Sequence, residues 1–144
     1  MFKPSAIAKV LGGRETLGSK VVSRQDLVAE VRRGLRVSAV DAVTAELDLP
    51  RTEVLPALRI PRRTMERRKQ TGRLSPEESE RVYRFAKIFA FAESVLGNKE
   101  KARHWLTSPN RALRNATPLS LLETEAGADE VSNVLGRIDY GVYS

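Results

Sequence analysis

The fold is decided by residues 75–96, which read SPEESERVYRFAKIFAFAESVL. The segment opens as a helix does, because Ser75 can cap it, Pro76 suits the first turn, and Glu78 can accept from the cap amide. Two apolar stripes follow at helical spacing: Val82, Phe85, Phe89, Ala92 and Leu96 form one, and Ile88, Phe91 and Val95 form the other. We therefore expect the second half of this helix to be largely buried, in the chain's own core, in a homodimer seam, or in both.

Shorter helices are predicted on the N-terminal side of this segment. Ser23 and Asp26 form a capping-box pattern ahead of one helix, and residues 38–47 repeat apolar positions at helical spacing. Pro50 and Pro61 punctuate two further short helices. The first residues show no sustained period. The sequence thus predicts three parts: a loosely ordered segment at 1–24, a helical region at 25–96, and a second small domain at 97–144.

The long helix is expected to end at Gly97, and the pattern beyond it is also helical. One helix is expected over 99–106, another begins at Thr117-Pro118 and ends at Gly127, and a last one covers about 129–135. The chain is therefore predicted to be mainly α.

The last nine residues differ from the rest. Ile138, Tyr140 and Val142 alternate with other residue types, a period of two that predicts an extended segment over 136–144. This tail is either an edge strand on its own domain or a segment that enters a partner's groove with its tyrosines as anchors.

The net positive charge of the chain is carried by its first half. Residues 1–74 hold 16 Lys and Arg against 8 Asp and Glu, a net charge of +8, whereas residues 75–144 hold 9 against 10. The densest cluster is Arg59, Arg62, Arg63, Arg67, Arg68, Lys69 and Arg73, with Glu66 as its single acid. This asymmetry favours nucleic acid as a partner of the first half, and a solvated helix face is the alternative.

The residue inventory argues against catalysis. The chain has no cysteine and one histidine, His104, which excludes disulfides, thiolate nucleophiles and two-histidine metal sites. The longest apolar run, residues 88–92, is too short to span a membrane, and the N-terminus lacks a signal-peptide pattern. We expect a cytoplasmic protein that is not an enzyme and has no cofactor, metal or membrane partner.

Residues 54–68 have the spacing of a helix-turn-helix. Pro61 would open the second helix, whose first residues reach base edges in the major groove. Apolar residues fall at the positions that contact between the helices requires: Val54, Leu58, Ile60 and Met65. Three residues depart from the pattern, namely Pro56 inside the first helix, Arg59 in place of the turn glycine, and Arg68 at an apolar position.

The second half resembles a known family. The matching motifs are Ala102-Arg103-x-Trp105-Leu106, Pro109-Asn110-x-Ala112-Leu113, Thr117-Pro118-Leu119-x-Leu121-Leu122, Thr124-Glu125-x-Gly127-Ala128 and Leu135-Gly136-Arg137-Ile138-x-Tyr140-Gly141-Val142. They resemble the toxin-binding domain of Xre/MbcA/ParS antitoxins, and residues 73–84 resemble the preceding part of the same proteins. The resemblance covers roughly residues 35–144 and is most specific from residue 102 onward.

This resemblance implies an antitoxin that pairs with a RES-domain toxin, an NAD-consuming enzyme, and also binds operator DNA through a Cro-like N-terminal region. We also expect a homodimer, because a protein that reads DNA in this way gains from two half-sites and the long helix has two apolar stripes. The implied DNA-binding residues are Arg62, Arg63, Thr64, Arg67, Arg68 and Lys69. The implied toxin-binding residues, which would enter the NAD pocket, are Gly136, Arg137, Ile138, Tyr140, Gly141, Val142, Tyr143 and Ser144. The alternative is a free-standing dimeric transcription regulator with no toxin partner. An NAD-using enzyme would lack residues for the chemistry.

Overall fold

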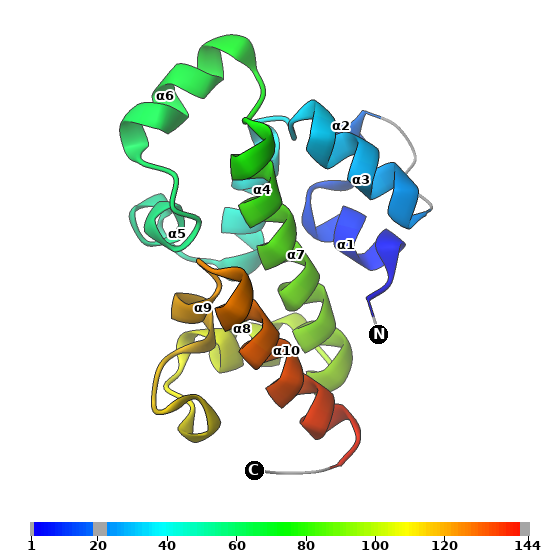
Figure 1. Ribbon diagram of the computed structural model, residues 1–144, viewed down its shortest axis with the longest axis vertical. Helices are drawn as coiled ribbons and strands as arrows, with labels where there is room; N and C mark the ends of the chain where they lie inside the picture. Colours follow the sequence, from blue (N-terminus) through cyan, green and yellow to red (C-terminus); the bar gives the residue numbers. More distant parts are fainter. Residues whose placement is uncertain (1, 19–22, 142–144) are drawn as a thin grey trace.

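The computed structural model describes residues 2–18 and 23–141, and these residues form helices joined by short connections (Figure 1). The elements are α1 (Pro4–Val10), α2 (Gly13–Leu17), α3 (Arg24–Arg33), α4 (Ser38–Leu47), α5 (Arg51–Ala57), α6 (Arg62–Thr71), α7 (Pro76–Leu96), α8 (Lys99–Thr107), the 3-10 helix η1 (Arg111–Leu113), α9 (Pro118–Leu121) and α10 (Glu125–Asp139). The described part contains two isolated bridges and no strand. The prediction of a mainly α chain is confirmed.

Helix α7 is the axis of the molecule, and α1, α3, α4, α8 and α10 all pack against it (Figure 1). Its start is the predicted capping box. The Ser75 hydroxyl accepts from the Glu78 amide at 3.1 Å, and Glu78 Oε1 accepts from the Ser75 amide at 2.8 Å. Its end is Gly97, whose φ of 104° lies in the left-handed region that favours glycine.

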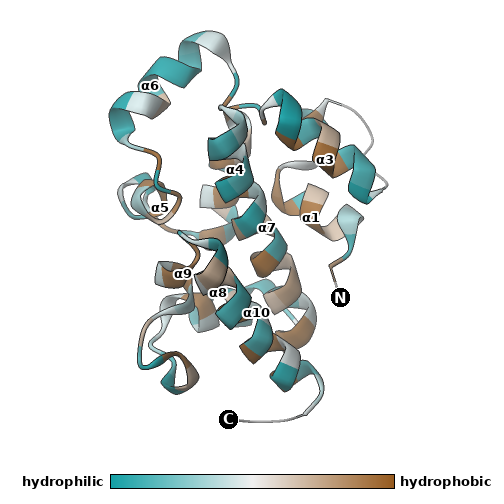
Figure 2. Cartoon of the chain, viewed as in Figure 1, coloured by the Kyte–Doolittle hydropathy of each residue, from teal (hydrophilic) through white to brown (hydrophobic). Residues whose placement is uncertain are grey.

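Both apolar stripes of α7 pack in the core of the chain. Phe85 and Phe89 are fully buried, and Phe91 is buried with its ring edge-to-face on Phe2, with 5.0 Å between centroids. Hydrophobic residues of the surrounding helices face α7 (Figure 2). The core interpretation is confirmed. The stripes do not form an exposed dimer seam, because only Val95 and Leu96 among them remain partly exposed.

The prediction of a loosely ordered segment at 1–24 is wrong for its described residues. They form α1 and α2, and the common core contains Ile7 and Val10 of α1, its C-cap Leu11, and Leu17 of α2. Helices of seven and five residues are too short to show a period or to be stable alone, so their order comes from packing, of α1 on α7 and of α2 on α1 and α4. Helix α1 and the preceding Phe2 therefore cover part of the apolar α7 surface that the sequence left free for a dimer.

The C-terminal helices differ from the prediction in two respects. Gly127 does not end a helix but lies in the first turn of α10, after the cap Thr124. The predicted extended segment is helical from Gly136 to Asp139, because Ile138 continues the apolar face that Val131, Val134 and Leu135 begin. The remaining tail residues Val142, Tyr143 and Ser144 lie outside the described residues.

Candidate functional sites: helix α6 and the end of helix α10

The segment from α5 to α6 has the predicted helix-turn-helix order. Pro61 is the N-cap of α6, and Arg59 occupies the turn with a φ of 54°, the left-handed conformation usual for glycine. The four apolar residues picked out by spacing are all buried: Val54, Leu58, Ile60 and Met65. The turn therefore keeps its shape even though its sequence departs from the pattern.

Helix α6 extends away from the rest of the molecule and is strongly hydrophilic (Figure 2). Four of the predicted DNA-binding side chains are exposed on it: Arg62, Arg63, Arg67 and Lys69. Thr64 is half-buried, and the single acid, Glu66, pairs with Lys69 at 3.4 Å. A groove of about 940 Å³ separates α5 from α6, and Arg51, Arg59, Arg62 and Lys69 are among its lining residues. Such a surface is suited to a polyanion.

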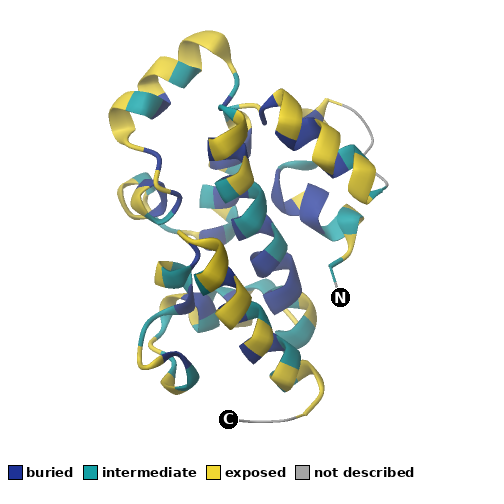
Figure 3. Cartoon of the chain, viewed as in Figure 1, coloured by how far each residue is buried: buried dark blue, intermediate teal, exposed yellow. Residues whose placement is uncertain are grey.

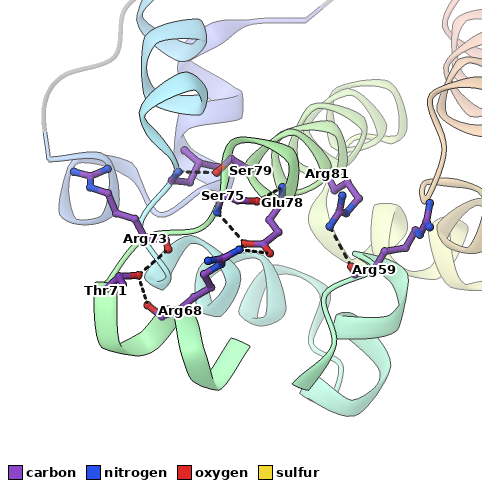
Figure 4. Close-up of polar contacts among 9 residues, drawn as sticks. Arg59, Arg68, Thr71, Arg73, Ser75, Glu78, Ser79 and Arg81 are labelled. Atoms are coloured by element: carbon purple, nitrogen blue, oxygen red, sulfur yellow. Dashed lines mark hydrogen bonds and ion pairs between the residues drawn. The ribbon is translucent and has the colours of Figure 1, made fainter. Parts of the chain in front are cut away.

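Arg68, the remaining predicted DNA-binding residue, points inward (Figure 4). Its Nε donates to Glu78 Oε1 at 2.8 Å and its Nη2 donates to Oε2 at 3.1 Å, a bidentate pair in which the Glu78 side chain is 7% exposed. Burial raises the pKa of Glu78, but hydrogen bonds from Arg68 and from the Ser75 amide outweigh it, and the net pKa is lowered. The same pair raises the pKa of Arg68.

Arg81 makes a second link between α7 and the helix-turn-helix (Figure 4). Its Nε donates to the Leu58 carbonyl at 2.8 Å and its Nη2 donates to the Arg59 carbonyl at 3.1 Å. Burial lowers the pKa of Arg81. Sequence reasoning missed both Arg81 and the second role of Glu78. The one available signal was Arg68 itself, a charged residue at an apolar position of the motif.

The end of α10 carries the described part of the predicted toxin-binding set. Tyr140 is 81% exposed, Arg137 and Gly141 are exposed, and Gly136 and Ile138 are partly buried. A groove of about 840 Å³ runs beside Arg137 and Tyr140 and reaches Lys87 of α7. The end of α10 and helix α6 lie at opposite ends of the molecule (Figure 1).

The described residues show neither of two other kinds of site. None of their histidine, aspartate and glutamate side chains form a group of three that could hold a metal ion. Among the described helices, none has the length and hydropathy needed to cross a bilayer.

Known proteins match the chain over both halves. The antitoxin Xre-like helix-turn-helix domain matches residues 26–87, and the antitoxin Xre/MbcA/ParS C-terminal toxin-binding domain matches residues 91–141. The protein named Antitoxin Xre from Yersinia enterocolitica is 40% identical over 120 residues, which is 82% of this chain and 81% of that protein. The chain belongs to the Xre antitoxin family.

Two more Xre antitoxins match. The one from Photorhabdus laumondii is 34% identical over 90% of this chain and 88% of its own length. The one from Pseudomonas putida is 37% identical over 57% of this chain and 52% of its own length. This Xre antitoxin therefore combines a DNA-binding domain of the helix-turn-helix type with a toxin-binding domain, and it is a regulator, not an enzyme. The matched regions meet within α7.

Proposed function

We propose that this Xre antitoxin neutralises a RES-domain toxin by placing residues 136–144 in the toxin's NAD site, and that as a homodimer it represses its own operon through α6. The observation that carries the first half is Tyr140, a large aromatic side chain that is 81% exposed at the end of an otherwise anchored helix. Exposed aromatic and arginine side chains are typical anchors of protein interfaces.

The base of this proposed plug is rigid. Helix α10 buries Ala128, Val131, Val134 and Leu135 against the core, so the chain leaves the domain in a fixed direction at Asp139. A segment held in place before binding loses less entropy in the complex than a free tail does. Neutralisation is then steric, because the segment occupies the space that NAD needs.

The plug is tested by co-expression with the RES-domain toxin. Deleting residues 140–144 leaves α10 whole, so the variant is expected to melt like the wild type yet to lose neutralisation, with growth arrest and falling cellular NAD. Tyr140→Ala is the single-residue version, and Glu130→Ala, exposed on the same helix, is its control. A truncated chain that is stable and still rescues growth would overturn the plug.

The DNA half of the proposal rests on the exposed charge of α6. Arg62, Arg63, Thr64, Arg67 and Lys69 are the residues proposed to meet DNA, Arg62 and Arg63 by bidentate hydrogen bonds to guanine. Replacing both by alanine is expected to weaken operator binding by about 1–3 kcal/mol for each guanine that is no longer bound. Gel shifts on the DNA upstream of the gene measure this. Unchanged binding by the double variant would place the DNA interface outside these two residues.

A further inference from the structure

Helix α6 has little apolar packing to fix its orientation. Of its ten residues, from Arg62 to Thr71, only Met65 is buried, and the helix is exposed along most of its length (Figure 3). An α-helix that reads DNA must nevertheless be held at a defined angle to the rest of its domain, because its first residues must reach base edges together. Polar contacts from outside α6 must therefore supply part of the restraint.

The first turns of α7 supply such contacts. The Glu78 carboxylate binds the Arg68 guanidinium in the two-point geometry that an arginine fork permits, and its Oε1 also accepts from the Ser75 amide. The carboxylate cannot rotate away without breaking its own helix cap. The second turn of α6 is thus fixed against the N-terminus of α7.

One turn further along α7, the Arg81 guanidinium restrains the other helix. It donates to the carbonyls of Leu58, the C-cap of α5, and of Arg59 in the turn. These are end-of-helix carbonyls that have no partner within α5. Residues 78 and 81 are three apart and share one face of α7, so one rigid surface holds both helices of the motif.

We infer that Glu78 and Arg81 are positioning residues for the DNA interface, and that Arg68 acts inward through Glu78 and makes no phosphate contact. This inference rests on the proposed binding of DNA through α6. It predicts an effect on DNA affinity opposite to the one expected from net charge. Removing the negative charge of Glu78, close to a surface that meets a polyanion, weakens DNA binding, whereas charge alone would strengthen it.

The test compares full-length variants on the upstream DNA at several salt concentrations. Glu78→Gln keeps the cap, since glutamine also serves at that position of a capping box, but it loses the ion pair. We expect it to lower operator affinity at least tenfold. Arg68→Lys keeps the positive charge and loses the fork, and we expect the same loss. Equal or tighter binding by either variant overturns the inference.

The salt dependence separates positioning from direct phosphate binding. Arg67→Ala, at the exposed neighbour of Arg68, is expected to reduce the log–log salt slope by about 0.9, the value for one phosphate contact. Arg68→Lys should leave that slope unchanged. Arg81→Gln is expected to weaken binding, with Arg84→Gln as its control. Arg84 lies one turn further on and bonds to Leu122 and Glu125, not to the motif. Equal losses from Arg81→Gln and Arg84→Gln would refute the role of Arg81.

A second readout does not depend on DNA. Glu78→Gln should raise amide hydrogen exchange in residues 62–71 and leave residues 99–107 of α8 unchanged. If the wild type shows no binding to the upstream DNA, the proposed DNA function fails, and exchange still decides whether Glu78 orients α6. Unchanged exchange in α6 overturns the inference whether or not DNA binds.

Discussion

Two glycines of α10 should respond to alanine in opposite ways. A Cβ added to Gly127 overlaps the carbonyl oxygen of Leu121 and lies 2.9 Å from its carbonyl carbon, whereas a Cβ on Gly136 meets nothing within 4 Å. The Leu121 carbonyl is backbone at the end of α9, so it cannot rotate aside as a side chain does. Gly127 is needed for close approach of two helices, and Gly136 is not.

The magnitudes follow from this geometry. In Gly127→Ala, overpacking lowers the free energy of unfolding by an amount near the top of the range of about 1–3 kcal/mol. The better helix propensity of alanine raises it by up to about 1 kcal/mol. The net destabilisation is about 1–2 kcal/mol, a fall in Tm of roughly 3–6 °C for a chain of this size. Gly136→Ala gains helix propensity without a steric clash, so it should raise the free energy of unfolding by about 0.5–1 kcal/mol and Tm by roughly 2–3 °C.

Thermal melts followed by circular dichroism measure both variants beside the wild type. Because Gly136 and Gly127 share one helix, differences in helix content or in the unfolded chain affect them alike, and the contrast in sign isolates the contact with α9. Gly127→Ala protein that melts at or above the wild-type temperature would refute the reasoning.

Three further outcomes are expected. Phe91→Ala should lower the free energy of unfolding, measured in urea, by about 3–5 kcal/mol, because it removes a buried ring that packs on Phe2. Light scattering should show no change in its oligomeric state. A shift to monomer would instead identify Phe91 as part of a dimer interface. Ser75→Ala should cost about 1 kcal/mol through loss of the cap, and a melting curve equal to the wild type would contradict this. The folded pKa of Glu78 is lowered, so its ionised form stabilises the protein at pH above the ordinary glutamate pKa of about 4.3, and this contribution is lost as pH falls through the lowered value. The difference in free energy of unfolding between the wild type and Glu78→Gln should therefore be constant above the ordinary glutamate pKa and shrink below it. A difference that grows on acidification would contradict a lowered pKa of Glu78.

Helix boundaries that depend on local chemistry could be predicted from the sequence. The capping pairs at Ser23 with Asp26 and at Ser75 with Glu78 both form, and Gly97 ends the central helix where expected. Each of these interactions joins residues at most a few positions apart, so the sequence contains all the information that they require.

Features that depend on tertiary packing could not be predicted in this way. Helix α1 is ordered by packing on α7, and α2 by packing on α1 and α4, and no window of residues 1–24 reveals these contacts. At the other end, residues 136–144 fit a period of two because Ile138, Tyr140 and Val142 alternate. The helical period that the structure adopts is visible only when Ile138 is compared with Val134, four residues earlier. Nine residues are too few to separate the two periods.

The assignment of Arg68 shows a similar limit in the candidate site. Residue type and motif position place it with its neighbours on α6, and capping alone explains Glu78 at its position in the sequence. One carboxylate performs both roles, because Oε1 accepts from the cap amide and from Arg68 Nε at once, while Oε2 accepts from Arg68 Nη2. Sequence patterns assign one role to each residue, so this double role is visible only in three dimensions.

The arrangement around α7 also bears on how the two proposed activities combine. Glu78 and Arg81 hold the helix-turn-helix, and one turn further along Arg84 bonds to Glu125 and to the Leu122 carbonyl of the toxin-binding half. One helix of 21 residues, about 30 Å long, thus sets the relation between the two halves. Helix α6 and the end of α10 lie at opposite ends of the molecule, so the surfaces proposed for DNA and for the toxin are separate on one chain (Figure 1). On one chain, the residues proposed for DNA and the residues proposed for the toxin are therefore different, and the two proposed partners do not compete for the same side chains.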